Sequence, residues 1–267
     1  MFIDVLTFGK EKIRAGKYIH LFSLKMSRTK VLLDFRSNHK VVIGIQARMS
    51  SVRFPGKVLA QFQGKTIIEH VVNACLNLDF PCFVLTSKEP TDDQLVAFLK
   101  KRKIDFYRGD LNNVLSRFKS FTEEFAFDEI VRISADSPLL HHEVIKKVFS
   151  NSRNLSESDI VTNIFPRSFP KGESVERLSL FAMKKMEKLQ LSKSNLEHVT
   201  SYIYENPVDF QITNVSNEID LSHLSLCVDT PSDLLRLDMM LGELDICLKD
   251  GLPEWKIFSR LLSKRDV

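Results

Sequence analysis

The segment VVIGIQARMSSVRFPGK, residues 41–57, decides how the chain is to be interpreted. It begins with a largely apolar run of strand length, residues 41–47, as expected of a strand buried in a parallel sheet. The following residues are strongly basic, and Pro55 and Gly56 break the strand pattern. A buried strand that ends in a short, stiff, basic loop indicates an anion-binding loop at the end of that strand.

This basic loop, defined here as residues 48–57, carries side chains that suit phosphate oxygens: Arg48, Ser50, Ser51, Arg53 and Lys57. Arginine can grip two oxygens at once, and lysine adds a point charge. The Pro55–Gly56 pair predicts a tight turn that returns Lys57 toward the loop. Neither the dinucleotide fingerprint GxGxxG nor the Walker pattern GxxxxGK[ST] occurs here. The composition of the loop leaves two alternatives, a phosphate site or a solvated basic turn.

Outward from this loop, short apolar runs alternate with longer amphipathic ones. Strands are expected at 82–87, 104–109, 129–135, 159–164, 175–178, 209–215 and 226–229. Helices are expected at 91–102, 111–125, 141–150, 179–190 and 195–205, and from Thr66, Pro231 and Pro253. Thr66 begins a T-x-x-E capping box. The alternation with short connections predicts an α/β sandwich with a mainly parallel sheet.

The composition is that of a soluble globular protein, with 43% hydrophobic and 27% charged residues in a chain of 267. A net charge of +4 without a long basic block argues against general nucleic-acid binding and allows a local anion site. No apolar run reaches about 18 residues, so no membrane insertion is expected. The cysteines lack CxxC spacing, and we interpret them as reduced thiols of a cytoplasmic protein: Cys75, Cys82, Cys227 and Cys247.

Residues 1–40 do not share the pattern of the rest. They lack the basic start and the cleavage site of a signal peptide. We expect an extension with little fixed structure, or an upstream start with Met26 nearer the true one. The alternative is a helix that packs on the domain or touches a partner. Residues 41–267 are expected to form the functional domain.

Two aspartates follow apolar runs, just as the basic loop follows the apolar run 41–47. Asp136 comes where the run 129–135 ends, and Asp229 ends the run 226–229. Each has a structural alternative, as the cap of the turn or helix that follows. Ligands of open parallel sheets bind beyond the carboxyl ends of the strands, and Mg²⁺ takes one or two carboxylates plus phosphate oxygens. The two aspartates and the basic loop therefore make a candidate site for a metal-bound triphosphate.

Three stretches together resemble a family: RMSSVRFPGK (48–57), ADSPL (135–139) and VDTPSDL (228–234). They look like the cytidylyltransferases that make CMP-activated sugars, including the CMP-ulosonate and acylneuraminate synthetases and, nearest, the SpsF-like spore-coat polysaccharide branch. The likeness covers about residues 41–245. It implies the three-layer α/β/α fold of the nucleotide-diphospho-sugar transferases (GT-A-like) and a homodimer. It also implies transfer of CMP from CTP to a ulosonic or nonulosonic acid, with release of pyrophosphate, for a surface polysaccharide.

The resemblance also implies roles for individual residues. Arg48, Lys57, Asp136 and Asp229 would be catalytic, and the two aspartates would hold Mg²⁺. The nucleotide would contact the basic-loop residues listed above together with Thr86 and Ser87. The sugar would contact Arg167, Glu176 and His198.

His198 and Glu176 also have a plain interpretation as packing or surface residues. An S-x-x-E pattern from Ser194 to Glu197 predicts a capping box and places His198 in the first turn of a helix. Arg167 lies in a proline-flanked loop that we expect to act as a lid.

The chain departs from the family pattern at five positions: Lys88, Asn113, Ala135, Ser174 and Leu196. These departures lie mostly where the sugar should bind, so the sugar stays open. Two alternatives to a CMP-sugar synthetase follow. One is a nucleotidyltransferase with another base or acceptor, and the other is a relative that binds a nucleotide without turnover.

Overall fold

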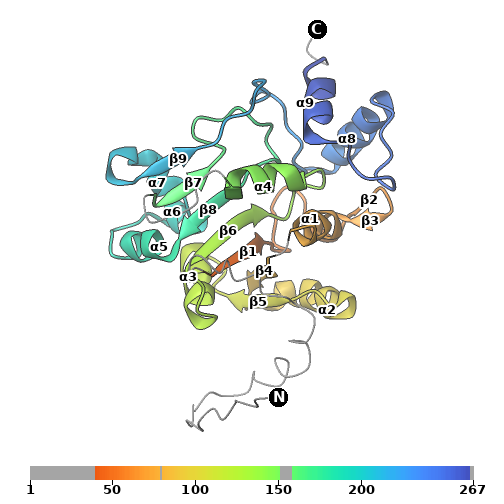
Figure 1. Cartoon of the computed structure of the whole chain (residues 1–267). Coiled ribbons are helices and arrows are strands. Elements are labelled where there is room, and N and C mark those ends of the chain that lie inside the picture. Colours follow the sequence, from red (N-terminus) through yellow and green to blue (C-terminus); the bar gives the residue numbers. More distant parts are fainter. Residues whose placement is uncertain (1–39, 79, 151–157, 265–267) are drawn as a thin grey trace, which may run out of the picture. The chain divides into compact units, whose positions relative to one another are not determined.

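A computed structural model describes residues 40–78, 80–150 and 158–264, so the expectations for residues 1–39 lie outside the described residues. A seven-stranded sheet runs through the centre in the order β5-β4-β1-β6-β8-β7-β9 (Figure 1). Its strands are β1 (Val41–Gln46), β4 (Cys82–Ser87), β5 (Phe106–Gly109), β6 (Glu129–Ser134), β7 (Ile160–Thr162), β8 (Glu176–Ser179) and β9 (Ile212–Asn214). Strand β8 pairs antiparallel with β6 and β7, and the other pairings of these described strands are parallel.

Helices cover both faces of this sheet and leave a separate apolar core on each. One core includes side chains of α1 (Ile67–Leu76), α2 (Asp93–Arg102), α4 (His142–Ser150), α8 (Pro231–Glu243) and α9 (Trp255–Ser263). The other includes side chains of α3 (Val114–Glu124), α5 (Leu180–Glu187) and α7 (Ser201–Glu205). The short helix α6 (Lys193–Glu197) lies against α3. The predicted three-layer α/β/α sandwich with a mainly parallel sheet is confirmed.

The central strand β1 supplies both cores, because successive side chains of a strand point to opposite faces. Ile43 and Ile45 pack into the core shared with α1, whereas Val42 packs into the core shared with α3. Gly44 lies between them, where a Cβ would come within 2.6 Å of the Ile130 side chain on β6. The apolar run 41–47 is therefore buried on both faces of the sheet.

Local sequence signals account for several helix starts. Thr66 and Glu69 form the expected capping box of α1. Pro231 opens α8 behind a second box made by Thr230 and Asp233. The remaining small elements are strands β2 (Gln61–Phe62) and β3 (Lys65–Thr66) and the 3₁₀ turns η2 (Lys57–Leu59), η3 (Pro90–Asp92) and η5 (Pro207–Asp209).

The prediction of a strand at 226–229 is wrong. The segment is held at single points rather than by a ladder, since the Leu226 amide donates to the Lys171 carbonyl and the Val228 amide donates to the Asp136 carbonyl. The segment thus crosses the end of β6 and brings Asp229 close to Asp136. The apolar character of residues 226–229 does not predict this crossing.

The prediction of one helix at 195–205 is also wrong. Two short helices, α6 and α7, replace it, and Val199 between them has a φ of 32° that interrupts the helix. The capping box of α6 is formed by Ser192 and Asn195, not by Ser194. His198 accordingly follows the last turn of α6 instead of lying in a first turn.

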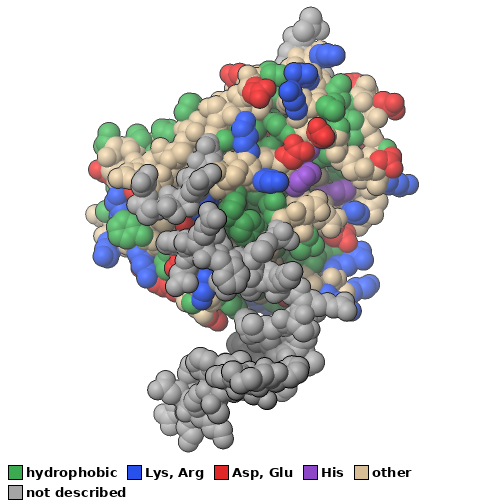
Figure 2. All heavy atoms as spheres, in the orientation of Figure 1, with side chains coloured by type: hydrophobic (Ala, Val, Ile, Leu, Met, Phe, Trp, Pro, Cys, Tyr) green, Lys and Arg blue, Asp and Glu red, His purple; other side chains and the backbone are tan. Residues whose placement is uncertain are grey.

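Figure 2 shows lysine, arginine and acidic side chains in small mixed groups over one face of the molecule. Among the described residues, none of the helices has the length and apolar character needed to cross a bilayer.

Candidate functional site

The basic loop is a closed structure built on a tight turn. The Lys57 amide donates to the Phe54 carbonyl at 3.1 Å, and between them Gly56 has φ 74° and ψ 8°. Pro55 at the second position and a left-handed glycine at the third are the hallmarks of a type II β-turn. The Gly56 amide also donates to the Met49 carbonyl at 2.8 Å, which closes the loop on itself. The turn predicted from Pro55–Gly56 is confirmed.

Sheet register explains why this loop meets Asp136. Strands β1 and β6 are parallel neighbours, with Gln46 opposite Ser134 at their carboxyl ends. The loop leaves one strand and Asp136 follows the other, so both lie at the same edge of the sheet.

Lys57 joins the loop to both aspartates. Its Nζ donates to Asp136 Oδ2 at 2.8 Å, to Asp229 Oδ1 at 3.0 Å and to the Val228 carbonyl at 2.9 Å. Its side chain is only 11% exposed. Burial lowers the pKa of Lys57, but the two carboxylates outweigh burial and hold that pKa above its ordinary value. Lys57 is therefore a fixed cation between two carboxylates.

The two arginines of the loop are also paired with acids from distant segments. Arg53 lies 2.9 Å from Asp229 Oδ2, and Arg48 donates to Glu197 Oε1 on α6 at 2.6 Å. Arg48, Arg53 and Lys57 thus face Glu197, Asp229 and Asp136, three cations against three carboxylates. Ser50 and Ser51 lie half-buried in the same loop. A phosphate chain that binds here would take over cations that are now neutralised within the protein.

The Asp136 and Asp229 carboxylates fit a divalent cation by their chemistry. Both present an oxygen to one cationic point, the Lys57 ammonium, so they converge as metal ligands must. Within the described part of the chain no group of three or more His, Cys, Asp or Glu side chains could hold a metal alone. A metal at this point would be bound by the two carboxylates together with phosphate oxygens of a substrate, as Mg²⁺ commonly is.

The neighbouring thiol does not join this chemistry. Cys227 Sγ lies 3.9 Å from Ser137 Oγ, and burial, with Asp136 nearby, raises the pKa of Cys227 to about 12. A thiol held in its protonated form is a poor nucleophile at neutral pH.

Thr86 and Ser87, expected to contact the nucleotide, use their hydroxyls within the protein. Both donate to Oδ2 of Asp92, which is fully buried. Asp92 lies near the start of the helix predicted at 91–102. The sequence does not reveal its burial, because acidic residues such as Asp92 and Asp93 are common at the start of any helix.

Arg117 is a second buried residue that the sequence interpretation missed. It is 1% exposed, and its guanidinium donates to the carbonyl groups of Leu85, Asp110 and Leu111. Burial lowers the pKa of Arg117 to about 10, and the opposing charge of Asp92 lies nearby.

The expected sugar contacts lie in three different settings. Glu176 is 1% exposed on β8 and accepts hydrogen bonds from Arg132, Thr200 Oγ1 (2.7 Å) and the Tyr204 hydroxyl (2.6 Å). Its oxygens are therefore engaged within the fold. His198 is exposed beside the Glu197 that binds Arg48.

Arg167 is half-buried and donates to Ser174 Oγ at 3.1 Å. Ser174 is one of the positions where this chain departs from the family pattern. Burial lowers the pKa of Arg167, and Cys227 and Glu176 oppose that shift from nearby. Arg167 is therefore a half-buried cation whose hydrogen bonds go to neutral groups, Ser174 Oγ and the Pro170 carbonyl.

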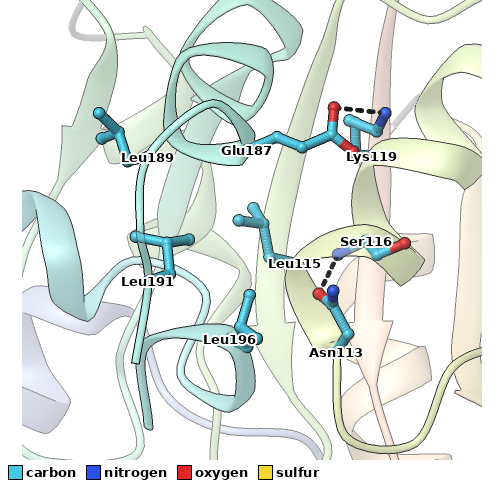
Figure 3. A pocket seen from close by; sticks show the side chains of 8 residues that line it. All are labelled: Asn113, Leu115, Ser116, Lys119, Glu187, Leu189, Leu191 and Leu196. Carbon is cyan, nitrogen blue, oxygen red and sulfur yellow. Dashed lines mark hydrogen bonds and ion pairs between the residues drawn. The ribbon is translucent and has the colours of Figure 1, made fainter. Parts of the chain in front are cut away.

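Two cavities lie near the start of α3, and the lining of neither includes Lys57, Asp136 or Asp229. The first, of about 180 Å³, is drawn in Figure 3 and is lined by Asn113, Leu115, Ser116, Lys119, Glu187, Leu189, Leu191 and Leu196. The second, of about 250 Å³, is lined by Lys88, Glu89, Tyr107, Gly109, Asp110, Ser116, Arg117 and Ser120. Both open beside the start of α3, where the Asn113 side chain caps the helix by accepting from the Ser116 amide.

Comparison with known proteins matches the cytidylyltransferase family over residues 41–250. The chain is 27% identical over 198 residues to the spore coat polysaccharide biosynthesis protein SpsF of Bacillus subtilis, which covers 71% of this chain and 81% of SpsF. A solved cytidylyltransferase of Leptospira borgpetersenii superposes with a TM-score of 0.73 at 29% identity, covering 77% and 87% of the two chains.

A more distant solved structure, CMP:2-keto-3-deoxy-manno-octonic acid synthetase complexed with CTP, superposes with a TM-score of 0.58. At 16% identity, and covering 76% of this chain and 99% of that one, it shows the shared fold. The matched region holds the basic loop, Asp136 and Asp229. The chain belongs to the cytidylyltransferase family, and it is an enzyme of that family.

Proposed function

We propose that this cytidylyltransferase transfers CMP from CTP to a sugar acid and releases pyrophosphate. One observation carries the proposal: the Lys57 ammonium of the basic loop lies between the carboxylates of Asp136 and Asp229. That arrangement provides cations for a triphosphate and two oxygens for a metal at one edge of the sheet.

In the proposed reaction the basic loop binds and orients the triphosphate. Arg48 and Arg53 bind phosphate oxygens through their guanidinium groups, and Lys57 adds its charge where negative charge accumulates. Asp136 and Asp229 would hold Mg²⁺, which when bound neutralises phosphate charge and withdraws electrons from phosphorus. A hydroxyl oxygen of the sugar bonds to the α-phosphorus as the bond to the pyrophosphate oxygen breaks. Positioning and charge neutralisation carry most of the catalysis in such transfers.

A sugar acid is proposed as the acceptor because the expected lid loop carries a half-buried cation, Arg167. Arg167 makes hydrogen bonds to Ser174 and to the Pro170 carbonyl, both of them neutral groups. A substrate carboxylate would offer a stronger, charge-assisted partner. Relatives named as 3-deoxy-manno-octulosonate cytidylyltransferases act on such an acid, and SpsF is named for a polysaccharide. We propose an analogous role in surface polysaccharide synthesis, with Glu176 and His198 near the sugar.

The decisive test measures pyrophosphate released from CTP and Mg²⁺ with a panel of ulosonic and nonulosonic acids. We expect release with at least one acid, loss of release in Asp136→Asn, and the largest thermal stabilisation with CTP among the four nucleoside triphosphates. CTP binding without release from any acid would favour a relative that has lost turnover. Absence of both binding and release would refute the proposal.

A homodimer stays a prediction from the family resemblance, and a cytoplasmic location stays a prediction from the cysteine pattern. Light scattering on the purified chain tests the oligomeric state.

A further inference from the structure

Asp92 is a fully buried carboxylate that accepts hydrogen bonds from four described donors. Oδ2 accepts from Thr86 Oγ1 at 2.8 Å, from the Ser87 amide at 2.9 Å and from the Ser87 hydroxyl. Oδ1 accepts from the Met49 amide at 2.7 Å. One oxygen therefore faces the end of β4, and the other faces the basic loop.

The Met49 peptide is the point from which the basic loop is built. Its amide is held by Asp92, and its carbonyl accepts from the Ser51 amide at 3.0 Å and the Gly56 amide at 2.8 Å. The residue before it is Arg48, and the Gly56 turn leads directly to Lys57. An anchor on Met49 thus holds both ends of the loop.

Asp92 is suited to this task because it stays charged while buried. Burial raises its pKa, but the hydrogen bonds from Met49, Ser87 and Thr86 outweigh burial and lower the pKa below its ordinary value. The buried cation Arg117 lies close enough to interact with this charge. Hydrogen bonds to an ionised acceptor are stronger than those between neutral groups, so the anchor is stiff.

We propose that Asp92 is a positioning residue for the triphosphate site, and that Thr86 and Ser87 act through Asp92. This inference rests on the proposed triphosphate site of the basic loop. Asp92 holds the Met49 amide, and the loop in turn presents Arg48 and Lys57 from its two ends.

The first test replaces Asp92 by Asn. The amide nitrogen is a donor, so in either orientation it opposes an amide N–H, that of Met49 or that of Ser87. We expect the Kd of Mg²⁺–inorganic triphosphate, measured by calorimetry, to rise about tenfold or more, the equivalent of one hydrogen bond to a charged group. Asp93→Asn is the control, because Asp93 is 62% exposed and pairs with Arg108 rather than with Met49.

The kinetic counterpart separates positioning from stability. A purely structural defect would lower the melting temperature and the active fraction yet leave the KM for CTP unchanged. We expect KM to rise in Asp92→Asn while Asp93→Asn keeps the wild-type value. Unchanged Kd and KM in a folded Asp92→Asn protein would overturn the inference, as would equal effects of the two variants.

A second pair of variants keeps the test valid if Asp92→Asn fails to fold. Thr86→Val removes one donor to Asp92 with little change of shape, and Thr86→Ser keeps the hydroxyl. We expect weaker triphosphate binding only in Thr86→Val, and an effect that is not additive with Asp92→Asn where the double variant can be made. Additive effects, or equal binding by both Thr86 variants, would contradict action through Asp92. Wild-type triphosphate binding without turnover of CTP would refute the proposed function alone.

Discussion

Lys57→Met tests the central ion pairs of the site. Methionine replaces most of the aliphatic stem of lysine and removes the ammonium. The substitution deletes three hydrogen bonds and leaves the facing oxygens of Asp136 and Asp229 without the cation between them. We therefore expect a loss of stability in the free protein as well as a loss of activity.

The size of the loss follows from how far the carboxylates are exposed. Breaking a fully buried ion pair costs about 3–5 kcal/mol. Here the Asp136 and Asp229 side chains are 25% and 40% exposed, so water screens part of the effect. We expect the free energy of unfolding to fall by about 2 kcal/mol, which for a domain of this size lowers the melting temperature by roughly 4–8 °C.

The assay is thermal and urea unfolding at neutral pH. Lys146→Met, at an exposed position of α4, is the control and should change stability by less than about 0.5 kcal/mol. A Lys57→Met protein as stable as the wild type at neutral pH would refute the assignment of Lys57 as the cation that holds both aspartates.

Three further predictions each concern the replacement of one carboxyl group. Asp136→Asn should lower the rate of pyrophosphate release by roughly 100-fold or more, because Asp136 would hold the Mg²⁺ that neutralises phosphate charge. Near wild-type release would contradict the role assigned to Asp136. Glu197→Gln should free Arg48 for the nucleotide and tighten CTP binding, by at most about fivefold because the pair is partly exposed; weaker binding by calorimetry would show that Glu197 orients Arg48 instead. Burial raises the pKa of the Glu173 carboxyl well above its ordinary value. The protonated carboxyl contributes stability that is fully present below the ordinary pKa. This stability is lost as pH rises through the folded-state pKa. Glu173→Gln should therefore gain stability relative to the wild type as pH rises above the ordinary pKa of a glutamate, as measured by urea unfolding, and a constant difference would contradict this.

Much of the fold was predictable because its signals are local. The apolar run of β1, the capping box at Thr66 and the proline at the start of α8 each depend on residues within a few positions. The Pro55–Gly56 turn is of the same kind. Strand–helix alternation then left few arrangements other than a sandwich around a parallel sheet.

The errors arose where local pattern and tertiary contact disagree. The run at 226–229 has the apolar character of a strand, but it makes single hydrogen bonds to two different segments. The stretch 195–205 reads as one helix, yet the chain turns at Val199, which packs in the core beside Ile203. Burial of these few residues outweighs the helical preference of their neighbours.

The sequence by itself determined the sandwich, the basic loop and the two aspartates as candidates, because apolar periodicity, turn chemistry and charge are written residue by residue. Only the tertiary structure decided which of these groups meet. Lys57 reaches Asp229 across 172 positions and Arg48 reaches Glu197 across 149, and Asp92 is buried under the loop that it anchors. Such contacts depend on sheet register and on chain crossings, which short-range pattern does not encode. An aspartate at the position of Asp92 could be an exposed residue of a helix start or a buried anchor, and the tertiary contacts decide which.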